Sequence, residues 1–153
     1  IYPHSGTEAM RRFRTLAFAG VILAAACTPP LDPHDPRSVA NHYVAAFNAK
    51  NVKALADLSP PNEAPMFFDL IEQGEKSDSW KILFYERAVE ACQAAGPATE
   101  VRKDEEGGAW VKVGETTDGR IVMVGLESQG TDYYSHGCAI MPKDIWLAQS
   151  KPS

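Results

Sequence analysis

The fold class is decided by residues 109–127, AWVKVGETTDGRIVMVGLE, which form two alternating runs around a turn. In residues 109–116 and again in 120–127, apolar side chains recur at about every second position, the period of a half-buried strand. Thr117-Asp118-Gly119 lies between the runs, and Asp-Gly in such a position is a strong hairpin signal. The stretch therefore predicts two antiparallel strands joined by a tight turn.

Further strand patterns flank this hairpin, at residues 99–103, 133–141 and 144–148. Upstream, apolar residues recur at helical spacing instead. Four helices are predicted: one from Pro36 with Asp35 as N-cap, one from Asn51 to the prolines at 60–61, one over 65–72, and one from 77 or 78 to Gly96-Pro97. Helices first and an antiparallel meander second indicate an α+β domain over residues 36–149, with N-terminal helices packed on a C-terminal sheet.

Composition excludes some partners. The chain has 153 residues, 44% of them hydrophobic, and a formal net charge of −5, which suits one globular domain. Without residues 1–26 it keeps 12 basic and 19 acidic side chains, a net charge of −7. An acidic domain repels phosphate backbones, so we expect no nucleic-acid partner.

The N-terminus has the pattern of a secretory leader. Met10 is followed by three arginines, then by an apolar stretch over residues 16–26 that ends in Leu23-Ala24-Ala25-Ala26-Cys27. This stretch is too short to span a bilayer and fits a signal peptide over 10–26. Residues 1–9 fit no leader pattern and are interpreted as an upstream misread start. A buried N-terminal helix is the alternative, against which Thr28-Pro29-Pro30 argues.

Small residues before Cys27 resemble the lipobox of bacterial lipoproteins, although the leucine lies four residues before the cysteine rather than three. The resemblance implies cleavage before Cys27, a diacylglyceryl group and further acyl chains on that cysteine, and anchoring in the cell envelope. Residues 27–35 would form a lipidated, proline-rich tether, and residues 150–153 a tail. Thr28 favours the outer membrane, facing the periplasm, if the source is Gram-negative.

Residues 38–55, SVANHYVAAFNAKNVKAL, together with the closing Asp144-Ile145-Trp146-Leu147, resemble nuclear-transport-factor-two-like (cystatin-like) domains. The family pattern is a helix, an Asn-Ala-x-Asn break, a second short helix and a last strand that carries tryptophan. The resemblance implies a cone of helices against a curved sheet, with room for a pocket between them.

Two cysteines, Cys92 and Cys138, remain once Cys27 is lipidated. In an oxidising compartment we expect them to form a disulfide, with two free buried thiols as the alternative.

Ser135-His136-Gly137-Cys138 also resembles the active-site segment of L,D-transpeptidases, which implies Cys138 as nucleophile and His136 as its base. Ile140 stands where that family has arginine, and no histidine lies between Gln93 and Ser135. In a regular strand His136 and Cys138 would share a face, about 6.5–7 Å apart, too far for a hydrogen bond without a bend at Gly137.

The expected function is therefore binding rather than catalysis, with a small hydrophobic ligand or an envelope protein as partner, besides the membrane. The alternative is an enzyme, either a divergent transpeptidase or a pocket-based isomerase or hydrolase. In the latter case Asp132, Tyr133, Tyr134 and His136 would line the pocket. No Cys/His spacing indicates zinc and no Gly-rich loop indicates a nucleotide, so no metal and no cofactor are expected.

Overall fold

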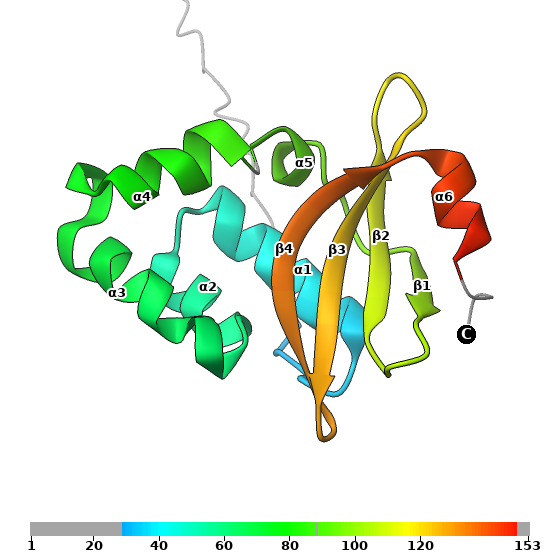
Figure 1. The fold of residues 1–153 in the computed structure, drawn as a ribbon, viewed down its shortest axis with the longest axis horizontal. Helices are drawn as coiled ribbons and strands as arrows, with labels where there is room; N and C mark the ends of the chain where they lie inside the picture. Colours follow the sequence, from blue (N-terminus) through cyan, green and yellow to red (C-terminus); the bar gives the residue numbers. More distant parts are fainter. Residues whose placement is uncertain (1–28, 88, 150–153) are drawn as a thin grey trace, which may run out of the picture.

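The computed structural model describes residues 29–87 and 89–149, and it is an α+β fold in which helices precede a four-stranded antiparallel sheet (Figure 1). The fold class predicted from the sequence is confirmed. In chain order the elements are α1 (Pro36–Asn48), α2 (Val52–Leu58), η1 (Pro61–Glu63), α3 (Ala64–Gln73), η2 (Gly74–Lys76), α4 (Asp78–Lys81), the π-helix η3 (Ile82–Arg87), α5 (Val89–Gln93), β1 (Glu100–Lys103), β2 (Ala109–Glu115), β3 (Ile121–Gln129), β4 (Asp132–Met141) and α6 (Lys143–Ala148).

Several predictions concern the ends of the chain. The misread start (1–9), the signal peptide (10–26), the lipidated Cys27 and the tail (150–153) lie outside the described residues. Within the part that is described, no helix combines the length and the apolar character needed to cross a bilayer.

The first two helices begin at the side chains predicted to cap them. The Asp35 carboxylate accepts a hydrogen bond from the Arg37 N–H at 2.9 Å, and the Asn51 side-chain oxygen accepts one from the Ala54 N–H at 3.1 Å. Each bond satisfies an N–H that the first helical turn leaves without an intrahelical partner. Both helix starts follow from local sequence alone.

The predicted fourth helix is divided into α4, η3 and α5. Trp80, Phe84 and Cys92 are spaced by four and eight residues, and an α-helix with 3.6 residues per turn rotates such positions progressively off a common face. A π turn closes i→i+5 hydrogen bonds and so holds more residues per turn. All three side chains are buried in one cluster, because the wider turn compensates for their spacing.

The sheet has the order β1-β2-β3-β4, and each neighbouring pair is antiparallel. The predicted Asp118-Gly119 turn joins β2 to β3, and Gly119 has φ +82°, a conformation that favours glycine. The Thr116 N–H donates to the Arg120 carbonyl at 2.9 Å and closes this turn. β4 lies at one edge of the sheet, where its first residues meet the chain that leads into α1.

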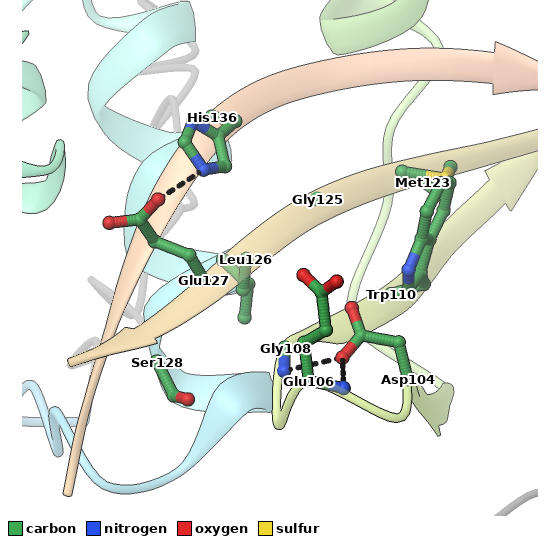
Figure 2. A pocket seen from close by; sticks show the side chains of 10 residues that line it. All are labelled: Asp104, Glu106, Gly108, Trp110, Met123, Gly125, Leu126, Glu127, Ser128 and His136. Atoms are coloured by element: carbon green, nitrogen blue, oxygen red, sulfur yellow. Dashed lines mark hydrogen bonds and ion pairs between the residues drawn. The ribbon is translucent and has the colours of Figure 1, made fainter. Parts of the chain in front are cut away.

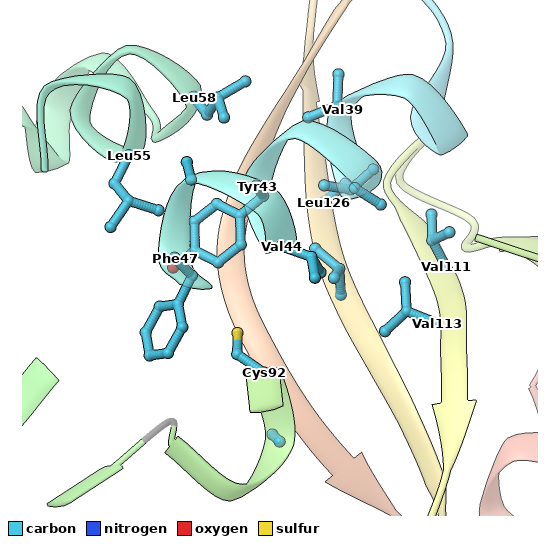
Figure 3. Close-up of a cluster of buried hydrophobic side chains, with 14 of the residues drawn as sticks. Val39, Tyr43, Val44, Phe47, Leu55, Leu58, Cys92, Val111, Val113 and Leu126 are labelled. Carbon is cyan, nitrogen blue, oxygen red and sulfur yellow. The ribbon is translucent and has the colours of Figure 1, made fainter. Parts of the chain in front are cut away.

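The helix-facing side of the sheet forms the main core (Figure 3). α1 packs across β2, β3 and β4, α5 packs against β3 and β4, and α2 packs on α1. Side chains from both layers interdigitate there, including Val39, Tyr43, Val44, Phe47, Leu55, Cys92, Val111, Val113, Val124 and Leu126. Burial of this apolar area is the main term that stabilises the domain.

The predicted strand over residues 144–148 is wrong, because these residues lie in α6. Trp146 is buried whereas its neighbours Ile145 and Leu147 are exposed, and an alternation this short does not distinguish a strand from one helical turn. Trp146 packs with Ile121 and Met123 on the sheet face opposite α1, which we call the outer face.

A buried arginine holds α6 in that position. The Arg102 guanidinium donates to the carbonyls of Trp146, Leu147 and Gln149, the first at 2.9 Å, and forms an ion pair with Glu100 at 2.7 Å. Carbonyls at a helix C-terminus lack intrahelical partners and carry partial negative charge, which a guanidinium neutralises. Arg102 therefore fastens the last helix to the outer face.

Candidate functional site

Cys92 on α5 and Cys138 on β4 are brought together at disulfide distance. Their Cα atoms are 5.4 Å apart, within the range that a disulfide spans. Cys92 is fully buried, and Cys138 packs against the main core. The pair links the helical layer to the edge strand of the sheet across 46 residues of sequence.

His136 does not share a face with Cys138, so the expectation from a regular strand is wrong. Gly137 pairs with Gly125 and Ser135 pairs with Leu126, which leaves His136 as the extra residue of a β-bulge. Gly137 takes φ +107° at this point. A bulge reverses the alternation of side chains along a strand, and His136 accordingly lines an outer-face pocket while Cys138 faces the core.

The His136 ring is held between two carboxylates. Its Nδ1 lies 3.1 Å from a Glu63 oxygen on η1, and its Nε2 lies 2.8 Å from a Glu127 oxygen on β3. The imidazole therefore joins the helical layer to the sheet around the edge of β4. Burial, with a smaller contribution from the Glu63 charge, raises the pKa of the nearby Tyr43 phenol to about 12.

The outer-face pocket is an open cavity of about 540 Å³ lined by the β1–β2 turn and by residues of β2, β3 and β4 (Figure 2). Figure 2 shows Asp104 and Glu106 on one side, Glu127 with His136 on another, and Trp110 with Met123 on a third. Gly125 leaves the strand between them without a side chain. The volume falls within the range of small-molecule sites, about 300–1,000 Å³.

The β1–β2 turn forms one wall of this pocket and is internally braced. Asp104 Oδ1 accepts hydrogen bonds from the N–H groups of Glu106 at 3.0 Å and Gly108 at 2.7 Å. A Cβ at Gly108 would lie 2.8 Å from the Leu126 carbonyl oxygen, closer than real Cβ contacts come. Glycine is therefore required for the turn to approach β3.

The residues predicted to line an enzyme pocket are not brought together. Asp132 pairs with His34 at 3.0 Å, and Tyr133 packs against the main core. Among Asp132, Tyr133, Tyr134 and His136, only His136 lines the outer-face pocket. Within residues 29–87 and 89–149, no three His, Cys, Asp or Glu side chains gather as metal ligands.

A second, apolar hollow of about 340 Å³ lies between α3 and the α4–η3 segment. Met66, Leu70 and Ile82 line it, and Met66 and Ile82 are exposed. Its chemistry suits the small hydrophobic ligand expected from the sequence better than the outer-face pocket does. It offers no titratable side chain among its described lining residues.

Sequence reasoning missed most of the outer-face pocket. None of Trp110, Asp104, Glu106 and Glu127 was predicted from the sequence as a site residue. The available signal was the alternation of β2 and β3, which places Trp110, Met123 and Gly125 opposite the core residues. What the sequence does not report is that Trp146 of α6 covers Ile121 and Met123 and leaves a pocket beside them.

Comparison with protein-family models, with curated proteins and with solved structures found no match for this chain.

Proposed function

We propose that this chain is a lipid-anchored lipoprotein of the bacterial cell envelope whose domain binds a ligand or protein partner without catalysis. The anchor is Cys27, exposed by cleavage of the signal peptide over residues 10–26, and the outer membrane is its place in a Gram-negative source. The leader pattern of arginines, apolar stretch and small residues before the cysteine supports this. Several acyl chains on one cysteine suffice for stable membrane attachment.

The fold within this proposal is a cystatin-like cone. Helices α1 and α5 pack on one face of a twisted antiparallel sheet, which supports that architecture. Two features differ from the family pattern on which the expectation rests. The chain closes on α6 rather than on a strand, and the space between helices and sheet is filled by the main core. Ligand binding is therefore assigned to the outside of the sheet.

The proximity of Cys138 to Cys92, with His136 turned away, is the observation that carries a binding role. Covalent catalysis by cysteine needs a free thiolate beside a base. Here the thiol position faces the core at disulfide distance from Cys92, and the imidazole is engaged by Glu63 and Glu127 instead. An open pocket that holds acidic, aromatic and thioether side chains but no nucleophilic cysteine suits recognition.

Lipid anchoring is tested by expressing the wild type and Cys27→Ser in a bacterial host fed with labelled palmitate. We expect label and detergent-phase partitioning for the wild type only, with the variant kept as precursor or released as soluble protein. Cys138→Ser serves as the matched control, because it removes a cysteine without touching the anchor. Labelled, detergent-partitioning Cys27→Ser protein would contradict the proposed anchor.

The absence of thiol catalysis is tested by incubating the purified, unreduced protein with a peptidoglycan tetrapeptide and a thiol-reactive probe. We expect neither stoichiometric labelling of Cys138 nor formation of cross-linked peptide. Labelling of Cys138 together with cross-linking that disappears in His136→Ala would instead establish the transpeptidase alternative.

A further inference from the structure

We propose that the outer-face pocket binds a small organic cation, an amine or guanidinium on an apolar or flexible stem. This deepens the proposed binding function and does not depend on the lipid anchor. The pocket is defined by its described lining residues, which are Asp104, Glu106, Gly108, Trp110, Met123, Gly125, Leu126, Glu127, Ser128 and His136.

The charge of the lining selects the sign of the ligand. Asp104, Glu106 and Glu127 each contribute a carboxylate, and none of the described lining residues is lysine or arginine. The Glu127 carboxylate is shared with His136 and Gln129, so a cation adds to the partners that it already has. The buried guanidinium of Arg102 is paired with Glu100 and with the C-terminal carbonyls of α6. Phosphates and carboxylate ligands are therefore repelled, whereas a cation is attracted.

The spread of the carboxylates selects an organic cation over a metal ion. Glu127 stands across the pocket from Asp104 and Glu106 (Figure 2), and the described side chains nowhere converge as metal ligands. A divalent ion needs several oxygens within about 2–2.6 Å of one point. Carboxylates on separate walls instead match a ligand whose charges lie several ångströms apart or whose stem spans the cavity.

The remaining lining residues provide an apolar surface for the stem. The half-buried Trp110 lies on one side beside the buried Met123, and Gly125 exposes backbone where another residue would place a side chain. Indole rings attract ammonium and guanidinium groups and also bury methylene groups. Trp110, Met123 and Gly125 are fixed by sheet register, and the acidic turn opposite them is braced by Asp104, so the site is preformed.

The test is calorimetric titration of the full-length protein, purified in a neutral detergent, with spermidine as the probe. We expect saturable binding, and about fivefold weaker binding in Glu106→Gln and in Glu127→Gln, the effect of losing one partly exposed charge pair. Trp110→Leu is expected to weaken binding similarly. The matched control is Glu105→Gln, which removes the same charge from the same turn but from a residue that does not line the pocket; its affinity stays within about twofold of wild type.

Further arms identify the source of the cation and keep the proposal falsifiable. An Ala-Lys-Lys-Ala amide that binds more tightly than spermidine identifies lysine side chains of a peptide as the source, and the reverse identifies a free polyamine. Urea unfolding midpoints for each variant separate loss of binding from loss of fold. Any of four results overturns the proposal. They are equal weakening of spermidine binding by Glu105→Gln, saturable binding of inorganic phosphate, full displacement of spermidine by Mg²⁺, and no saturable binding of either amine. None of these outcomes bears on palmitate labelling at Cys27, so the two proposals fail separately.

Discussion

Loss of the link between Cys92 and Cys138 is expected to remove about 4 kcal/mol from the free energy of unfolding. A disulfide here closes a loop of 46 residues, and in the chain-entropy model a loop of that length restricts the unfolded chain by about 4 kcal/mol. Replacing both cysteines by alanine adds a packing loss on the order of 1 kcal/mol, because Cys92 is fully buried. Domains of this size have a total stability of about 5–15 kcal/mol, so the change is large.

The assay is urea unfolding of the purified protein, followed by tryptophan fluorescence, in three forms. These are the oxidised wild type, the wild type reduced with dithiothreitol, and the Cys92→Ala/Cys138→Ala double variant. With an m-value of about 1–3 kcal/mol/M, a loss of 4 kcal/mol lowers the midpoint by about 1.3–4 M. The double variant should unfold slightly earlier than the reduced protein, because reduction preserves the sulfur atoms in the core.

Coincident midpoints for the oxidised and reduced wild type would refute this reasoning. Alkylation before reduction, followed by intact-mass measurement, verifies the starting state, since both Cys92 and Cys138 must escape modification. Dithiothreitol must also leave the midpoint of the double variant unchanged, which excludes an effect of the reductant elsewhere. Two alkylated thiols in exported protein would show that the link does not form there.

Three further predictions concern single residues. The raised pKa of Tyr43 means that the fold favours the neutral phenol. The stabilisation from this phenol is therefore complete below about pH 10, and the free energy of unfolding falls by about 2–3 kcal/mol as pH rises through 12. Urea midpoints of Tyr43→Phe should lack this alkaline loss, and a parallel loss in the variant would contradict the prediction. Gly137→Ala should lower the free energy of unfolding by about 2–3 kcal/mol, more than Gly119→Ala does. Both glycines have positive φ, but only at Gly137 would a Cβ come within 3.3 Å of the Tyr43 oxygen. Equal urea midpoints for the two variants would refute the contribution of this steric contact. Arg102→Met should release α6 and lower the unfolding free energy by about 2–3 kcal/mol, because the last carbonyls of α6 lose their partner. Hydrogen exchange should become faster in α6 alone, and unchanged exchange in α6 would refute this prediction.

Local signals predicted much of this fold. Asp35 and Asn51 cap the helices that follow them, and Asp118-Gly119 forms the turn between two strands, because each effect depends on atoms a few residues apart. The alternation of β2 likewise follows from one face being buried, whereas the first four residues of β3 are buried on both faces. Such features are encoded within short windows and need no knowledge of the rest of the chain.

Other features depend on distant partners and were not predictable. α6 is helical although its alternation resembles a strand, because Arg102, more than 40 positions earlier, satisfies its last carbonyls. The bulge at His136 exists because Gly137 and Gly125 meet across two strands. The outer-face pocket in turn depends on both, since α6 covers part of that face and the bulge turns His136 toward the rest.

The attachment of the leading segment to the sheet sets how far the domain reaches. The Tyr133 N–H donates to the Pro33 carbonyl at 2.8 Å, and His34 pairs with Asp132, so the chain is attached to the sheet six residues after Cys27. Six fully extended residues span about 20 Å at most. With acyl chains on Cys27, as proposed, the start of β4, where the segment is attached, stays within that distance of the lipid headgroups. The β3–β4 hairpin and the β1–β2 turn lie at the same end of the sheet (Figure 1). The domain then works at the bilayer surface, and its ligand has to arrive there.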